Sequence, residues 1–312
     1  MRQMEGLIAA AFTPFHQDGS LNLALVPALV DKLYADGLQG IFVCGSNGEG
    51  PNMTTSERMQ VAEAFVQAGD GRLKIIVHVG HSSIAEAKIL AAHAAQIGAD
   101  AFSSVAAFYF KPVSVANLTD CMVAIATAAP DLPFYYYHIP HLTGVGMDMV
   151  DFLQYAGPRI PNLAGIKYTA TTLQEYQSLL NIDKGRHDIL FGLDELLLPA
   201  LSVGARAAIG STYTFAAPLY LETIKAFRRG DWEAARIHHS YMVEVIRILL
   251  LYPPIPGQKA IMKMLGFDMG PCRLPLTTLN AASYEKFYHE LDNIGFFSKL
   301  PALHTSLATG EK

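Results

Sequence analysis

Lys167 is the residue of this 312-residue chain whose type and setting most directly suggest chemistry. It lies in an apolar segment, residues 165–169, where a charged ammonium group is costly to bury. A dry site would lower the pKa of this side chain and leave a neutral amine, which can attack a carbonyl carbon and form a Schiff base. From the residues alone, the alternative is a lysine whose head group extends to water at a strand end.

The loop at residues 45–50 has the sequence Gly-Ser-Asn-Gly-Glu-Gly and could bind an anion. Its glycines expose backbone N–H groups, and Ser46 and Asn47 add a hydroxyl and an amide as donors. Glycines are also common in ordinary turns between a strand and a helix. The loop by itself therefore leaves an anion site and a structural turn both open.

Residues 134–140, Phe-Tyr-Tyr-Tyr-His-Ile-Pro, combine strand-forming residues with candidate proton donors. Alternation along a strand would place Tyr135 and Tyr137 on one face and Tyr136 on the other. A tyrosine that points into the site can carry a proton next to an imine, although packing is the usual role of tyrosines in strands. His138 is interpreted as a structural group.

Asp194 and Glu195 are adjacent carboxylates after another expected strand. Two carboxylates at this place can accept hydrogen bonds from a polyol, or they can cap the helix that follows. Spacing alone favours the cap, because Asp is a good N-cap residue and Glu suits a first helical turn. The hydroxyl-rich residues 210–213 follow the last expected strand and are individually weak signals.

Metal and disulfide patterns are not evident in the sequence. The pairs His78/His81 and His138/His141 have no third ligand at a recognisable spacing, so no metal site is expected. Three cysteines lie far apart without CxxC spacing, which fits neither a disulfide framework nor a zinc site. We expect reduced, buried thiols in a cytoplasmic protein. The cysteines are Cys44, Cys121 and Cys272.

Eight short apolar segments, each followed by an amphipathic segment, make up the part of the chain that must position these residues. The apolar segments lack strict alternation, as expected of parallel strands covered on both faces. Eight such units predict a (β/α)₈ TIM barrel of the α/β class, with functional groups at the C-terminal ends of the strands. An open doubly wound sheet is the main alternative, although the first strand is followed by Thr-Pro-Phe and not by a glycine-rich dinucleotide fingerprint. The expected strands are residues 7–13, 40–44, 74–80, 101–107, 134–139, 164–168, 189–193 and 207–210.

Past residue 211 the pattern becomes helical. Prolines 253, 254 and 256 are expected to separate the second of four helices from the third. We expect a barrel over residues 1–229 and a C-terminal helical extension over residues 230–312 that packs on it as a single structural unit. The four expected helices are residues 217–228, 232–250, 257–265 and 281–294.

Composition excludes several classes of function. Hydrophobic residues make up 51% of the chain and charged residues 16%, with a net charge of −5 and no basic block. A nucleic-acid binder would need a basic footprint. No apolar run approaches the ~18–20 residues that span a membrane, and the first residues lack a secretory h-region. The apolar surplus is expected in a large core and in subunit interfaces.

Taken together, three motifs are similar to those of the class I pyruvate lyases, a family that includes dihydrodipicolinate synthase and N-acetylneuraminate lyase. They are residues 45–49 (Gly-Ser-Asn-Gly-Glu), residues 137–140 (Tyr-His-Ile-Pro) with Thr143-Gly144, and residues 165–167 (Gly-Ile-Lys). The similarity covers residues 7–296, nearly the whole chain. It implies a (β/α)₈ barrel with C-terminal helices and a homotetramer.

By the same resemblance, Lys167 is the Schiff-base lysine and Tyr137 the tyrosine that transfers the proton. Ser46 and Asn47 occupy the site of the pyruvate carboxylate, and Asn47 stands where the family usually has Thr or Ser. Tyr109 matches a tyrosine that, in the synthases, reaches the site of a neighbouring subunit. No cofactor is implied, because the lysine itself supplies the electron sink.

Leu142 indicates the branch of the family. The synthases carry an arginine at this position, which holds the carboxylate of their second substrate. This chain has a leucine there, as the sialate lyases do. That branch cleaves N-acetylneuraminate reversibly to pyruvate and N-acetylmannosamine, small molecules that would be this protein's ligands. Further motifs similar to the sialate lyases lie at residues 135–140, 192–195, 209–213 and 269–276. The resemblance implies substrate contacts by Thr169, Gly192, Asp194, Glu195 and Ser211.

Three other functions remain open. The chain could be an aldolase for another 2-keto-3-deoxy sugar acid, or a dihydrodipicolinate synthase-like enzyme that accepts an aldehyde acid. It could also be a non-catalytic protein that binds a keto acid or sialic acid. The presence of both Lys167 and Tyr137 argues against the last, because binding alone requires neither.

Overall fold

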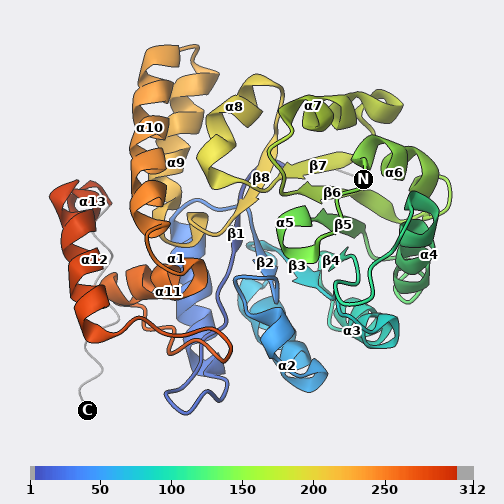
Figure 1. The fold of residues 1–312 in the computed structure, drawn as a ribbon, viewed down its shortest axis with the longest axis horizontal. Coiled ribbons are helices and arrows are strands. Elements are labelled where there is room, and N and C mark those ends of the chain that lie inside the picture. Colours follow the sequence, from blue (N-terminus) through green and yellow to red (C-terminus); the bar gives the residue numbers. More distant parts are fainter. Residues whose placement is uncertain (1–3, 301–312) are drawn as a thin grey trace.

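Eight parallel strands close into a barrel in the order of the sequence (Figure 1). In this computed structural model, which describes residues 4–300, the first strand pairs with both the second and the eighth, so the sheet has no open edge. The predicted TIM barrel is thereby confirmed, and the open doubly wound sheet is wrong. The strands are β1 (Gly6–Ala10), β2 (Gly40–Val43), β3 (Lys74–His78), β4 (Ala101–Val105), β5 (Phe134–His138), β6 (Leu163–Tyr168), β7 (Asp188–Phe191) and β8 (Ala207–Gly210).

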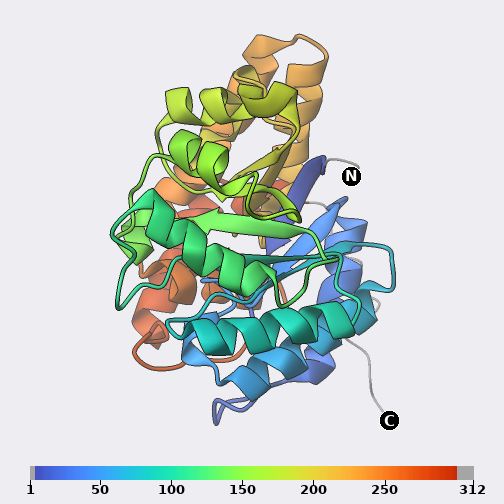
Figure 2. The ribbon, with the colours of Figure 1, turned by 90° about the vertical axis from the view of Figure 1, so that its right-hand side faces the viewer.

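Helices surround the barrel, and the C-terminal ones form a separate group on one side (Figures 1 and 2). None of the helices within residues 4–300 is long and apolar enough to cross a membrane. The helices are α1 (Val26–Ala35), α2 (Thr55–Gly69), α3 (Ile84–Gln96), α4 (Val115–Ala126), α5 (Pro140–Thr143), α6 (Met149–Ala156), α7 (Leu173–Asn181), α8 (Leu197–Ser202), α9 (Tyr213–Arg228), α10 (Trp232–Leu249), α11 (Pro254–Met264), α12 (Ala281–Asn293) and α13 (Phe296–Lys299).

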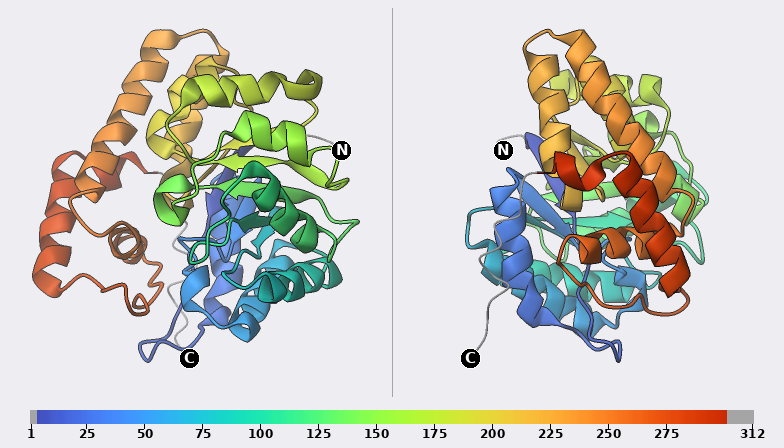
Figure 3. Two further views of the ribbon diagram at one scale, coloured as in Figure 1. Left: turned by 45° about the vertical axis from the view of Figure 1, so that its right-hand side comes forward. Right: turned by 90° about the vertical axis from the view of Figure 1, so that its left-hand side faces the viewer.

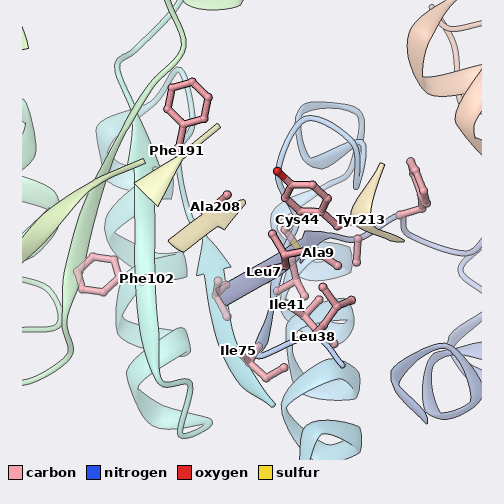
Figure 4. Packing of buried hydrophobic residues seen from close by; sticks show 14 of the residues in the cluster. Leu7, Ala9, Leu38, Ile41, Cys44, Ile75, Phe102, Phe191, Ala208 and Tyr213 are labelled. Atoms are coloured by element: carbon pink, nitrogen blue, oxygen red, sulfur yellow. The ribbon is translucent and has the colours of Figure 1, made fainter. Parts of the chain in front are cut away.

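Two hydrophobic cores lie on the two faces of the strands. The larger core fills the space between the barrel and the helices, where Leu7 of β1 and Ile41 of β2 pack near Leu38 (Figure 4). The smaller core fills the barrel interior and includes Phe42 and Tyr135. Because successive side chains of a strand point to opposite faces and both faces are covered, the strands are mostly apolar, which explains the missing alternation in the sequence.

Two C-terminal helices begin earlier than the sequence predicts. The helix expected at residue 217 starts at Tyr213 and contains Pro218 near its N-terminus, beside a kink at Ala216. The helix expected at residue 257 starts at Pro254. Proline fits the first helical turn because the first N–H groups of a helix have no partner within it. The prolines that separate α10 from α11 therefore also start α11.

The C-terminal segment is tied to the loop after β2 by a buried ion pair. Lys259 Nζ of α11 lies 2.6 Å from Glu49 Oε1, and both side chains are buried. The backbone N–H of Arg273 donates to the other oxygen of Glu49 at 2.8 Å. The Arg273 guanidinium also pairs with Glu57 at the start of α2 and holds the pKa of that carboxyl at about 2. These contacts fix α11 and the chain after it against the C-terminal ends of the strands.

Replacement of Lys259 by Met is expected to lower the free energy of unfolding by about 3 kcal/mol, because Glu49 would stay buried without its ion-pair partner. The double variant Lys259→Met/Glu49→Gln should lose less, since it removes both charges. Urea denaturation followed by circular dichroism measures the difference. The matched control is Lys225→Met, which breaks an exposed pair with Glu222 and should cost at most about 0.5 kcal/mol. Equal losses in the Lys259 and Lys225 variants would contradict this role.

Candidate active site

A cavity at the C-terminal ends of the strands brings most of the sequence-predicted site residues together. Its volume of about 470 Å³ falls within the range of small-molecule sites. Strand ends and the loops after them form one part of its wall, and residues of α10 and α11 form another. The predicted residues that line it are Ser46, Asn47, Tyr137, Leu142, Lys167, Thr169, Gly192, Asp194, Glu195 and Ser211.

Lys167 points from β6 into the barrel and is only 4% exposed. Its Nζ lies 4.0 Å from the ring centroid of Phe42 and 4.0 Å from that of Tyr137. Burial lowers the pKa of Lys167 to about 7, while the charge of Asp194 acts in the opposite direction. A large fraction of the side chain is therefore a neutral amine near pH 7. The alternative in which the head group extends to water is wrong.

Tyr137 lies beside Lys167 because the two residues are register partners on neighbouring strands, β5 and β6. Burial raises the pKa of Tyr137 to about 12, and the hydroxyl groups of Ser46 and Thr169 oppose that shift. The phenol therefore holds its proton near neutral pH. The predicted alternation is confirmed: Tyr135 and Tyr137 lie in the barrel interior, and Tyr136 packs in the outer core.

Asp194 does not cap the helix that follows it, contrary to the expectation from spacing alone. Its Oδ2 accepts hydrogen bonds from the backbone N–H of Thr212 at 2.8 Å and from the Thr212 hydroxyl at 2.6 Å. Burial raises the pKa of Asp194 to about 6, and the bonds from Thr212 oppose this. The carboxylate thus joins the ends of β7 and β8. A side chain at Gly210 would collide with it, since a Cβ atom there would lie 1.8 Å from Asp194 Oδ1.

Gly192 lines the cavity where the backbone must pass close to Thr169. A Cβ atom at Gly192 would lie 2.0 Å from Thr169 Oγ1, so any side chain there would displace the threonine. The backbone N–H of Gly192 donates to the carbonyl of Tyr168 at 2.8 Å and continues the pairing of β6 with β7. Glycine at this position therefore lets Thr169 remain beside Tyr137.

The loop after β2 holds Ser46 and Asn47 in a sharply turned backbone. Cys44 and Glu49 on either side adopt left-handed conformations, with φ of 59° and 53°. The backbone N–H of Glu49 donates to the carbonyl of Ser46 at 3.1 Å, and the Thr13 hydroxyl donates to the carbonyl of Gly48 at 2.7 Å. These bonds fix the loop at the edge of the cavity, where Ser46 and Asn47 belong to the lining. The anion site stays a prediction.

Tyr109 lies outside the cavity of this chain. It is 77% exposed and forms an edge-on contact with the equally exposed ring of Phe110. His138 points away from the cavity as well, and its ring stacks on Tyr168 with a centroid distance of 5.3 Å. Within residues 4–300, no group of three or more His, Cys, Asp or Glu side chains is arranged to hold a metal ion.

Several residues of the site were not found by the sequence reasoning. Phe42 contacts Lys167, and Thr212 holds Asp194. The buried Arg58 donates to the carbonyls of His78 and Gly80 and fixes the end of β3, beside the ring of Tyr137. An interior position on an expected strand is a usable signal for Phe42. The roles of Arg58 and Thr212 depend on contacts between distant elements, which no local pattern reveals.

The comparisons with known proteins agree with this geometry. The chain matches the dihydrodipicolinate synthetase family over residues 3–294. It belongs to that family. The resemblance to the class I pyruvate lyases, inferred from the motifs, is thereby confirmed.

Proteins similar to this chain include N-acetylneuraminate lyases and a DHDPS. N-acetylneuraminate lyase from Sus scrofa is 39% identical over 281 residues, which is 88% of each chain. The structure of N-acetylneuraminate lyase from Aliivibrio salmonicida, a sialic acid aldolase, has a TM-score of 0.93 and 38% identity, covering 97% of this chain and 100% of that one. The lysine-bound structure of DHDPS from Cyanidioschyzon merolae has a TM-score of 0.87 and 28% identity, covering 94% and 98%.

The rate at which pyruvate forms an imine is expected to rise with pH through about 7, because only the neutral Lys167 amine attacks a carbonyl. The Asp194 carboxylate raises the pKa of Lys167, so Asp194→Asn should move the rise in the rate of imine formation to lower pH. The rate of imine formation is measured at a series of pH values by trapping the imine with borohydride. The control is Asp131→Asn, which removes an exposed carboxylate outside the cavity lining and should leave the pH dependence of the rate unchanged. If the rise in rate stays at the same pH or moves to higher pH in Asp194→Asn, the effect of Asp194 on the pKa of Lys167 is refuted.

Proposed function

We propose that the protein is a Schiff-base aldolase that cleaves N-acetylneuraminate reversibly to pyruvate and N-acetylmannosamine. The observation that carries the proposal is the buried amine of Lys167 beside the Tyr137 phenol in a cavity of suitable size. The lyase names of relatives at 38–39% identity support the choice of substrate. The barrel fold alone would not support a particular substrate, because one fold hosts many activities.

Imine formation begins the proposed reaction. The neutral Lys167 Nζ attacks the C2 ketone of the open-chain sugar acid, and loss of water leaves a protonated imine. The aromatic rings of Phe42 and Tyr137 lie against Nζ and keep water away from it. This burial favours the neutral amine, although the faces of the two rings attract an ammonium group. The positive imine then becomes the acceptor for the electrons of the bond that breaks.

Cleavage of the C3–C4 bond follows. Tyr137 relays the proton: its oxygen accepts the proton of the C4 hydroxyl as that carbon becomes an aldehyde, while its own proton passes to the carboxylate of the substrate. The bonding electrons move into the imine and give an enamine. Protonation at C3 and hydrolysis then release pyruvate and regenerate the lysine. The raised pKa keeps the Tyr137 phenol protonated, so it can act as a relay that loses one proton as it gains another.

Substrate orientation is assigned to the polar groups around the lysine. Ser46 and Asn47 bind the carboxylate, and the amide of Asn47 can donate where relatives use a hydroxyl. Thr169 contacts the substrate near the imine. Gly192, Asp194, Glu195 and Ser211 hold the sugar hydroxyls from the ends of β7 and β8.

A homotetramer is part of the proposal. Tyr109, Phe110 and Val113 are exposed apolar residues close together in the sequence, and a subunit contact would cover them. In that assembly Tyr109 would reach a neighbouring subunit. A synthase-like activity on an aldehyde acid is the second candidate, and Leu142 disfavours it because a leucine cannot pair with a second carboxylate.

Lys167→Ala is expected to lower pyruvate release from N-acetylneuraminate by more than about a thousandfold, since no other residue would supply the amine. The circular dichroism spectrum should remain that of the parent protein. Lys88→Ala, which removes an exposed lysine of α3, is the matched control and should keep full activity. Pyruvate release is followed with a coupled dehydrogenase. Activity retained in Lys167→Ala would rule out the mechanism.

Leu142→Arg tests the choice of branch. The side chain is 60% exposed at the edge of the cavity, so an arginine can be accommodated there. Its guanidinium should bind the carboxylate of a short aldehyde acid and shift the ratio of kcat/KM values toward that substrate by about tenfold or more. The measurement compares sugar acid cleavage with condensation of pyruvate and the aldehyde acid. An unchanged ratio would show that Leu142 does not determine the branch.

A further inference from the structure

The cavity wall contributed by the C-terminal helices contains a single polar side chain among the described residues. From residues 246–276, the lining consists of leucine, isoleucine and proline, including Leu249, Ile255 and Leu276, together with Gln258 of α11. Figure 1 shows α11 between the barrel and α12, and the left panel of Figure 3 shows it nearly end-on beside the barrel. Gln258 thus faces the cavity from outside the ring of strands.

The side-chain oxygen of Gln258 has no hydrogen-bond partner among the described residues. The residue is only 5% exposed, and its Oε1 atom is buried without a hydrogen bond. A buried carbonyl oxygen without a hydrogen bond is unfavourable, so such groups normally have a partner. Half a turn about the last side-chain bond exchanges Oε1 with Nε2. The carboxamide can therefore offer either an acceptor or a donor to the cavity.

Gln258 comes from α11, outside the ring of strands, whereas Lys167 comes from β6 within it. In the proposed reaction Lys167 of β6 and the loop that follows β2 hold the keto acid. A ligand group that reaches α11 must extend beyond the strand ends, as the hydroxyl-bearing carbon chain of a sugar acid would. A hydroxyl group matches the carboxamide in both orientations, because it both donates and accepts.

We propose that Gln258 binds a hydroxyl group of the sugar portion of the substrate and so determines specificity for the polyhydroxylated partner of pyruvate. This inference rests on the proposed function. It assigns the binding of the sugar partly to the C-terminal extension and not to the strand ends alone. Gln258 does not take part in the bond changes at Lys167.

The test uses the condensation direction, in which pyruvate and N-acetylmannosamine are varied separately. Gln258→Met keeps the length of the side chain and removes both polar atoms. We expect its KM for N-acetylmannosamine to rise about tenfold, the loss of roughly one hydrogen bond. Its KM for pyruvate, its kcat and the borohydride-trapped pyruvate adduct at Lys167 should stay within about twofold of the parent values.

Two further variants make the result specific. Gln258→Glu keeps acceptor oxygens and should bring the KM for N-acetylmannosamine back to within about threefold of the parent. Gln154→Leu, an exposed glutamine of α6, is the matched control and should change neither KM. If the circular dichroism spectrum of Gln258→Met differs from that of the parent, the variant is misfolded, and a comparison of Gln258→Glu with Gln258→Ala replaces it.

An unchanged KM for N-acetylmannosamine, or an equal rise in the KM for pyruvate, would overturn the assignment of Gln258. Failure of the proposed function looks different, because the parent protein itself would then form a pyruvate adduct without condensing it with N-acetylmannosamine. The parent and variant measurements therefore separate the two outcomes.

Discussion

Burial of a single amine in the barrel interior is the interaction on which the proposed chemistry depends. A lysine in water is protonated near neutral pH and cannot attack a carbonyl, whereas the ammonium form of Lys167 loses its hydration inside the barrel. The closed sheet supplies the dry interior, and the rings of Phe42 and Tyr137 supply the immediate surroundings. Asp194 opposes the shift, so the pKa comes to lie near 7 instead of falling further. The balance gives an amine that is both available as a nucleophile and able to become the positive imine.

The C-terminal extension contributes to the site as well as to the bulk of the molecule. It provides the outer wall of the cavity, and its buried Lys259 pairs with Glu49 in the loop that carries Ser46 and Asn47. The ring of His239 in α10 also hydrogen-bonds the backbone carbonyl of Glu195 at 3.0 Å. Two sides of the cavity are therefore positioned by helices that lie outside the barrel. A barrel without this extension would lose these supports.

The sequence predicted the barrel and the central lysine for clear physical reasons. Eight apolar segments separated by amphipathic ones leave few other folds, and a lysine such as Lys167 is rare in an interior strand. Spacing alone misassigned Asp194 as a helix cap, because its partner Thr212 lies eighteen residues away at the end of another strand. The start of α11 was placed late because prolines were interpreted only as helix breakers. Gln258 and Arg58 gave no local signal, since their roles arise only when distant elements meet.

The most direct test of the account is borohydride reduction of the purified protein incubated with N-acetylneuraminate alone, followed by intact mass and peptide mapping. The account predicts a reduced pyruvate adduct on Lys167, which requires both cleavage of this sugar acid and an imine at this lysine. An adduct that appears only when pyruvate is supplied would contradict the substrate. The absence of any adduct on Lys167 with either compound would contradict the mechanism itself.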